Sequence, residues 1–423
     1  MPVFNSDASS SPIRRLVIID PGLHSRMGHH YNYVRAVVDA AHRRGLETLV
    51  LGPFMAGPDI QQELSVVPVF RIATYAPMVW DYSPTASETN PVVQEGQQVL
   101  MTNSIVFADL LVRASPLCRP DDLIFVHTVL ENQIMGITQW LGSLPGNERP
   151  RSNILLRFWH DKTHIKPVLE LCSTVLNSPA LRARYSTDTM ELSVLYSDLL
   201  RKAVDVVPIP MPIPYDALAP EARASRRRFL PEGLSPDTRV IAYAGDCRLQ
   251  KGFHFIRPVI EELLREAPCP VHFLIQISDV NFTDEMRESV RAIAPVAGPN
   301  VTVVQETLSA DDYYSFFNET DIMLINYDPR QYAYTSSGLF TEAMLLGKVS
   351  VIPAGTSMEN EARRLGTGYA SVGEFSALAL LQALYQALID YPVLAERSRT
   401  AMAGARRYHN ADTLVSYLIG EKI

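Results

Sequence analysis

The chain lacks the features that mark disulfide-stapled, membrane-spanning and secreted proteins. Its cysteines are few and form neither a CxxC pair nor a zinc-binding spacing, which favours reduced, mostly buried thiols. They are Cys118, Cys172, Cys247 and Cys269. No apolar run approaches the roughly 18–20 residues that span a bilayer. The first residues, MPVFNSDASSSPIRR, contain no apolar segment, so we do not expect a secretory signal there.

Basic charge is also scarce. The chain has 38 Lys and Arg against 46 Asp and Glu and a net charge of −8, whereas a dedicated nucleic-acid binder is usually basic. A hydrophobic fraction of 47% and a charged fraction of 20% are ordinary for a globular protein. A chain of 423 residues is too long for one ordinary core, so we expect two domains.

The N-terminal half alternates strand-like and helix-like segments. Its strand-like segments are short, continuous apolar runs, as in a parallel sheet covered on both faces. Its helix-like segments carry apolar side chains at i, i+3 and i+4 spacing. The sequence predicts strands at 14–20, 47–53, 66–74, 123–129 and 153–159, and helices at 30–45, 91–115 and 131–144.

A proline-rich break follows, after which the alternation restarts. Residues 204–239 hold seven prolines, and proline at alternate positions from 208 to 214 excludes a central strand. The sequence then predicts strands at 240–246, 271–278, 301–306, 321–328 and 349–355, and helices at 252–267, 375–391, 393–408 and 411–420.

Repeated strand–helix units predict an α/β fold of two facing Rossmann-like, doubly wound parallel-sheet domains with C-terminal helices. Ligands of such sheets bind beyond the carboxyl ends of the strands. The expected organisation is a flexible tail (1–12), an N-terminal domain (13–207), a proline-rich linker (208–238), a C-terminal domain (239–400) and C-terminal helices (401–423) that pack back on the N-terminal domain.

Two segments of the C-terminal half favour a nucleotide site. In AGDCRLQKGFHF (244–255) a strand is followed by Arg248 and Lys251, and Gly252 is expected to begin a helix. Two cations beside a helix N-terminus suit a diphosphate, although solvated loop residues are the plain alternative. In YAYTSSGLFTEAM (332–344), small residues precede a helix that carries Glu342. Its carboxylate suits a ribose diol, and an ordinary serine-capped helix is the alternative.

These segments resemble the donor half of GT-B glycosyltransferases, and most closely glycosyltransferase family four. The resemblance covers about residues 238–370 well and the N-terminal half more loosely. It implies that Arg248 and Lys251 hold the donor diphosphate and act in catalysis. It also implies that Gly338 and Leu339 bind the distal phosphate and that Glu342 binds the ribose. Ser337, just before them, is a further donor-binding candidate. The family motif has a glutamate at the position of Tyr334, and this chain lacks it.

The N-terminal candidates follow the predicted strands. Gly28 matches a glycine-rich segment that faces the donor, and the resemblance implies that His127, at a strand end, lies against the sugar. An incidental turn and a buried core histidine are the respective alternatives. The acceptor-side candidates are His29, His30, Glu131, Arg157 and His160, with Asn132 and Asp161 beside them.

The expected function is therefore transfer of a sugar from a nucleoside diphosphate sugar to a hydroxyl of a saccharide or lipid-linked acceptor, in polysaccharide or glycoconjugate assembly. The resemblance implies a retaining, hexosyltransferase-like enzyme without metal or cofactor, in the cytoplasm or peripheral at the cytoplasmic face of the membrane. The Arg226–Arg228 run suits contact with anionic lipid, and a solvated run is the alternative.

Three alternatives remain open. One is a catalytically silent GT-B protein that binds sugar nucleotide or a partner, which the Tyr334 substitution favours. The others are a nucleotide-sugar epimerase and a phosphorylase, although no convincing pyridoxal-binding lysine is found. A dehydrogenase and a P-loop ATPase are disfavoured, because no strand precedes GxGxxG and Gly347-Lys348 lacks the upstream glycine.

Overall fold

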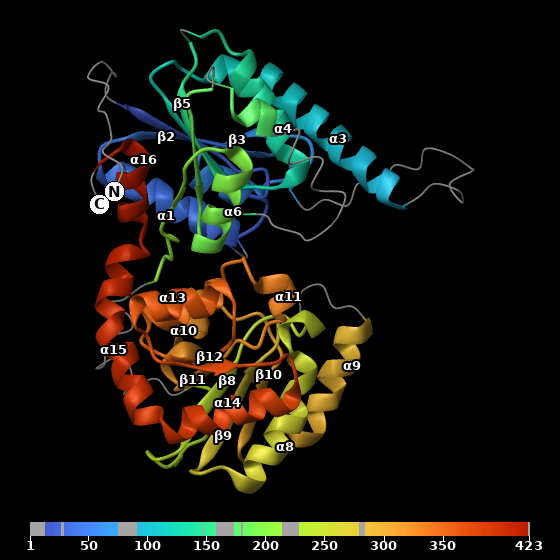
Figure 1. Cartoon of the computed structure of the whole chain (residues 1–423), viewed down its shortest axis with the longest axis vertical. Coiled ribbons are helices and arrows are strands. Elements are labelled where there is room, and N and C mark those ends of the chain that lie inside the picture. Colours follow the sequence, from blue (N-terminus) through green and yellow to red (C-terminus); the bar gives the residue numbers. More distant parts are fainter. Residues whose placement is uncertain are drawn as a thin grey trace. The chain divides into compact units, whose positions relative to one another are not determined.

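The structure is a computed structural model of the whole chain, and Figure 1 shows it as a ribbon. It describes residues 13–26, 29–74, 91–146, 148–157, 173–178, 181–213, 228–278 and 284–421. The chain divides into two compact units: residues 1–212 with 410–423 form the first, and residues 213–409 form the second.

The N-terminal unit is built on a seven-stranded, wholly parallel sheet of order β3-β2-β1-β4-β5-β6-β7. The strands are β1 (Arg15–Ile19), β2 (Glu47–Pro53), β3 (Val66–Phe70), β4 (Leu123–Val129), β5 (Arg151–Leu156), β6 (Ala183–Thr187) and β7 (Val204–Val206). The helices are α1 (His29–Arg43), α2 (Pro58–Glu63), α3 (Pro91–Asp109), α4 (Glu131–Ser143), α6 (Met190–Leu200) and α16 (Ala411–Ile419).

The C-terminal unit repeats the plan with a six-stranded parallel sheet of order β10-β9-β8-β11-β12-β13. The strands are β8 (Arg239–Tyr243), β9 (Val271–Gln276), β10 (Val301–Val304), β11 (Ile322–Leu324), β12 (Val349–Pro353) and β13 (Tyr369–Val372). The helices are α8 (Ile256–Glu266), α9 (Asp284–Ile293), α10 (Ala310–Asn318), α11 (Pro329–Tyr332), α12 (Gly338–Leu345), α13 (Ser357–Leu365), α14 (Ala377–Ile389) and α15 (Tyr391–Tyr408).

Each sheet has one point where the strand order reverses, between β1 and β4 and between β8 and β11. In open α/β sheets a crevice forms there, beyond the carboxyl ends of the two strands, and it is the usual ligand site. Each sheet is covered on both faces, as its largely apolar strands require: all seven residues of β4 and all six of β9 are buried. The predicted class of two Rossmann-like parallel-sheet domains is confirmed.

The last helix belongs to the first unit. Ala411, Leu414, Val415 and Leu418 of α16 join the core around α1, and Arg43 of α1 pairs with Asp412 at 2.8 Å. Helix α15 continues through residue 400, where we expected the donor domain to end, and the C-terminal unit extends to His409.

Some elements differ from those expected. Gly252 does not begin an α-helix: it has a φ of +69°, ends one 3₁₀ turn and precedes another, so α8 starts only at Ile256. Strand β7 occupies the start of the segment that we expected to be irregular, and β6 and β13 were not predicted. The expected basic run falls mostly outside the described residues, and Arg228 pairs with Asp312.

In the described part of the chain, no single helix is long and apolar enough to cross a membrane. The segments Ala377–Ile389 and Tyr391–Ile419 are long and apolar enough to span a membrane only when they are taken together, and the chain bends by 81° between them.

Candidate active site

The two cations predicted for a diphosphate lie together at the carboxyl end of β8. Arg248 is about half exposed, whereas Lys251 is 15% exposed, and both contact the carboxylate of Asp246, at 2.7 and 3.3 Å. Burial opposes ionisation of Asp246, but the charges of Lys251 and Arg248 outweigh it and lower the pKa of this carboxyl. The trio therefore carries one net positive charge.

The chain segment that follows β11 lies against this loop. The backbone N–H of Asp328 donates to the carbonyl of Gln250 at 2.7 Å, and the Lys251 ammonium lies 5.6 Å from the centre of the Tyr327 ring. Because β8 and β11 flank the point where the strand order reverses, the cations and this segment lie where a ligand crevice is expected in such sheets.

Helix α12 begins beside the same segment. Its first residue is Gly338, one of the small residues that we expected just before the helix, and the Ser337 hydroxyl caps the helix by accepting from the N–H of Phe340 at 3.2 Å. The side chains of Ser337 and Tyr327 are also hydrogen-bonded. The start of α12 is thereby tied to the segment that contacts Lys251, and the N–H groups of Gly338 and Leu339 belong to its first turn.

Glu342 lies one turn inside α12 and is half-buried. Its Oε2 accepts a hydrogen bond from the hydroxyl of Tyr313 on α10 at 2.7 Å. Burial raises the pKa of Glu342 to about 7, and the hydrogen bond from Tyr313 opposes the rise. A ribose hydroxyl at this carboxylate would meet Tyr313 as well.

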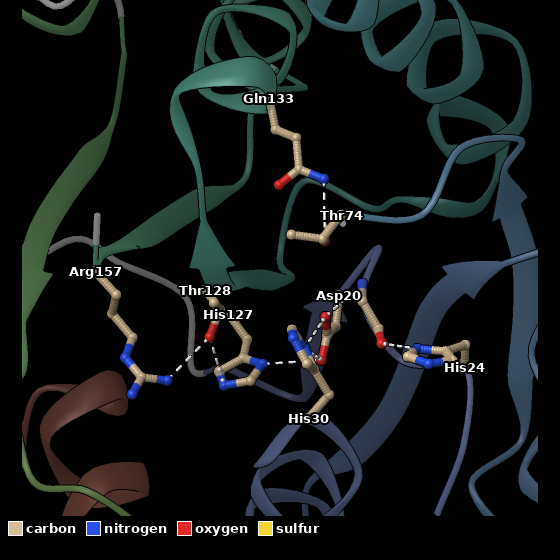
Figure 2. A network of polar contacts seen from close by, with 9 residues as sticks. Asp20, His24, His30, Thr74, His127, Thr128, Gln133 and Arg157 are labelled. Atoms are coloured by element: carbon tan, nitrogen blue, oxygen red, sulfur yellow. Dashed lines mark hydrogen bonds and ion pairs between the residues drawn. The ribbon is translucent and has the colours of Figure 1, made fainter. Parts of the chain in front are cut away.

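A second polar cluster lies at the reversal point of the N-terminal sheet (Figure 2). Asp20 follows β1 and is completely buried, and its carboxylate accepts from His30 Nδ1 at 2.8 Å, from His127 Nδ1 at 2.9 Å and from the N–H of Gly22 at 2.9 Å. Burial alone would raise the pKa of Asp20, but His30 and His127 outweigh it and hold this pKa well below its ordinary value.

His127 is completely buried, and both of its ring nitrogens are engaged. While Nδ1 contacts Asp20, Nε2 lies 2.9 Å from Thr128 Oγ1. The ring also packs against Tyr33 at a tilt of 36°, with 3.9 Å between ring centres. Burial lowers the pKa of His127 to about 4, and Asp20 opposes the shift only in part. The position matches the alternative that we left open, a buried and hydrogen-bonded histidine.

The chain is strained next to His127. Thr128 has a φ of +52°, in the left-handed region, and the pairing of β4 with β5 shifts register between Val126 and Val129. Strain of this kind in a β-branched residue is rare and clusters at functional sites. Figure 2 shows the side chain of Arg157 directed at Thr128, whose hydroxyl oxygen accepts from it at 3.2 Å, while Arg157 also pairs with Asp188 at 2.6 Å.

Gly22 makes room for the cluster. A Cβ at this position would lie 2.2 Å from the His30 ring, so no other residue fits without displacing that histidine. The sequence showed Pro21-Gly22 only as the end of a strand, and the structure shows that glycine is needed there because the His30 ring packs against it.

Asp20, His30 and His127 place three potential metal ligands within 4.8 Å of one another. The nitrogen–oxygen distances of 2.8 and 2.9 Å are also those of hydrogen bonds. The arrangement suits a buried polar network.

The structure brings together Arg248, Lys251, Ser337, Gly338, Leu339 and Glu342 in one unit, and His30, His127 and Arg157 in the other. Gly28, His160 and Asp161 lie outside the described residues, as do the side chains of His29 and Glu131. Sequence reasoning missed Asp20, Asp246 and Tyr313, although Asp20 and Asp246 are both the last residue of a predicted strand, which is a signal that could have found them.

Comparison with known proteins gives the fold. No protein-family profile and no curated sequence matches the chain. Solved structures do match it over nearly its whole length. Sucrose-phosphate synthase from Thermosynechococcus elongatus has a TM-score of 0.63 at 13% identity, covering 96% of this chain and 97% of that one. HepE from Anabaena in complex with UDP has a TM-score of 0.62 at 14% identity, covering 96% and 98%.

The catalytic domain of starch synthase IV from Arabidopsis thaliana, bound to ADP and acarbose, has a TM-score of 0.59 at 10% identity and covers 97% and 100%. At such identities the likeness establishes the two-domain GT-B fold, and the chemistry has to be argued from the residues of this chain.

Proposed function

We propose that this protein is a glycosyltransferase that moves a sugar from a nucleoside diphosphate sugar to a hydroxyl acceptor. The observation that carries the proposal is the convergence of three segments at the β8–β11 crevice: the Arg248–Lys251 loop, the residues after β11, and the start of α12 with Glu342. The UDP and ADP bound to HepE and starch synthase support a nucleotide ligand for the same fold.

The chemistry follows from charge. When the bond to the anomeric carbon breaks, that carbon becomes oxocarbenium-like and negative charge grows on the departing diphosphate. Arg248, Lys251 and the N–H groups of Gly338 and Leu339 would stabilise that charge most strongly in the transition state, which lowers the barrier. A bound diphosphate would also compete with Asp246 for the two cations.

The finer features remain part of the proposal: membership of glycosyltransferase family four, retention at the anomeric carbon, independence of metal and cofactor, and a role in polysaccharide assembly. The acceptor is proposed to bind at the N-terminal unit, where the strained Thr128 lies near the end of β4 and Arg157 directly follows β5.

The experiment is release of nucleoside diphosphate from a panel of UDP-, GDP- and ADP-sugars, with and without saccharide acceptors. Release from one donor that depends on an added acceptor supports transfer. A specific observation favours the second candidate, a silent sugar-nucleotide-binding protein: Tyr334 stands where the family has a glutamate. Nucleotide binding without acceptor-dependent release would support that candidate.

A further inference from the structure

Asn326 is a buried amide without a partner. Its side chain is 2% exposed, and neither Oδ1 nor Nδ2 has a hydrogen-bond partner in the part of the chain that the structure describes. The residue follows β11, where the N–H of Tyr327 donates to the carbonyl of Ile325 at 3.0 Å and closes a tight turn centred on Asn326.

The backbone of Gly252 covers this amide. A Cβ at position 252 would lie 2.8 Å from Asn326 Nδ2 and 2.4 Å from the Asn326 carbonyl oxygen. Gly252 has a φ of +69° as well, so the position requires glycine for two independent reasons. Asn326 therefore lies directly beneath the loop that carries Lys251, separated from it by a residue without a side chain.

Orphaned polar groups in the interior are destabilising and uncommon, so each needs an explanation. Among the described residues, two other buried atoms of the same sheet also have no partner: Ser350 Oγ, on the second residue of β12, and His272 Nδ1, on the second residue of β9. Both lie near the amino ends of their strands. Asn326 alone of these three lies at the carboxyl end, at the reversal point where a ligand is expected.

The charge in the crevice leaves a role for a neutral donor. Asp246 offsets one of the two cations, so the cluster carries a single net positive charge against a diphosphate that carries more than one negative charge. Neutral N–H donors fix a phosphate oxygen in direction without adding charge, and the carboxamide of Asn326 has two N–H bonds to offer.

We propose that Asn326 is a ligand of the donor diphosphate, with Nδ2 donating to a phosphate oxygen that also contacts Lys251. This inference rests on the proposed function. Because the amide lies against the backbone of Gly252, a displacement of the Lys251–Gly252 turn would open it to the ligand. The bound diphosphate then supplies the partner that the amide lacks in the free protein.

The test is calorimetric titration of the full chain with inorganic pyrophosphate, and with whichever of UDP, GDP or ADP binds, together with thermal melts. The variants are Asn326→Leu, which keeps the number and branching of the side-chain heavy atoms and removes the polar ones, and Asn326→Ser, which is a smaller polar variant for use if Asn326→Leu does not fold. Ser350→Ala is the matched control, because it removes an orphaned polar atom of the same sheet far from the crevice.

We expect Asn326→Leu to melt at or above the wild-type temperature and to bind pyrophosphate at least tenfold more weakly, while Ser350→Ala binds like wild type. A variant that binds pyrophosphate as wild type does would overturn the inference, and Asn326 would be an amide satisfied by buried water. Lower melting temperatures in both Asn326 variants would also overturn it, because the amide would then have a structural partner. If the wild-type protein binds neither pyrophosphate nor any nucleotide, the proposed function itself fails.

Discussion

Asp20 and His127 lie 107 residues apart in the sequence and 2.9 Å apart in the structure, from Oδ2 to Nδ1. They meet because β1 and β4 are neighbours at the point where the strand order reverses. The contact fixes the proton of His127 on Nδ1, so that Nε2 accepts from the Thr128 hydroxyl (Figure 2). A buried chain of hydrogen bonds thus runs from Asp20 to the strained end of β4.

The first prediction concerns Asp20→Asn. The carboxylate accepts three hydrogen bonds and is fully buried. Asparagine keeps only one acceptor oxygen, removes the negative charge and places an N–H donor against one of the groups that now donate to Asp20. Breaking one partner of a buried charged cluster typically costs about 3–5 kcal/mol, and we expect a loss of that size in the free energy of unfolding by urea. Asp39→Asn, an exposed change on α1, is the control and should unfold like wild type.

The second prediction is a pH dependence set by His127. Its pKa of about 4 lies below the ordinary 6.5, so the unfolded chain binds the proton more readily. The stability that His127 contributes is therefore full above pH 6.5 and is lost as the pH falls from 6.5 toward 4, by roughly 3 kcal/mol. We expect His127→Gln to flatten this part of the stability curve, measured by urea unfolding at several pH values. An unchanged slope would contradict the burial of an uncharged ring, and the exposed His42→Gln should keep the wild-type slope.

Glu342 predicts a dependence of the opposite sign. Its pKa is raised from 4.5 to about 7, so the protonated form favours the fold. The corresponding stability is full below pH 4.5 and is lost as the pH rises through about 7. Glu342→Gln should therefore raise the melting temperature at pH 8 and leave it nearly unchanged at pH 4.5, whereas the exposed Glu396→Gln should do neither. Equal shifts at both pH values would show that the carboxyl titrates normally.

A fourth prediction concerns turnover. Removing a group that stabilises transition-state charge typically costs about 2.7–4 kcal/mol of barrier. Lys251→Ala should therefore lower the rate of nucleoside diphosphate release on the order of a hundredfold or more, with the melting temperature kept. Arg257→Ala, which removes an exposed cation of α8 paired with Glu261, should leave the rate unchanged. Normal turnover in Lys251→Ala would contradict the proposal that Lys251 binds the donor diphosphate.

Much of the fold could be predicted from apolar runs alone. The predicted strand at 123–129 coincides with β4, because a strand buried on both faces needs an unbroken apolar run. Strand β6, with the sequence ARYST, and strand β13, with YASV, contain no such run and were missed. The predicted helix start at Gly252 was wrong, because the left-handed conformation of this glycine ends a turn instead.

The positions of Arg248 and Lys251 after a strand and of Glu342 within a helix could be predicted from the sequence, and their roles stay predictions. Partnerships between distant segments could not be predicted. Nothing in the sequence pairs Tyr313 with Glu342 or Asp20 with His127, since these contacts depend on which strands and helices become neighbours. The orphaned amide of Asn326 is likewise visible only when its surroundings are known.

The central claim is that the crevice between β8 and β11 binds a nucleoside diphosphate. The most direct measurement is calorimetric titration of the purified protein with UDP, GDP and ADP, repeated on Lys251→Ala and Glu342→Ala. Micromolar binding of one nucleotide that is lost in both variants is the predicted result. Absence of binding to all three nucleotides would contradict the account, and Arg248, Lys251 and the start of α12 would then be an ordinary loop and an ordinary helix start.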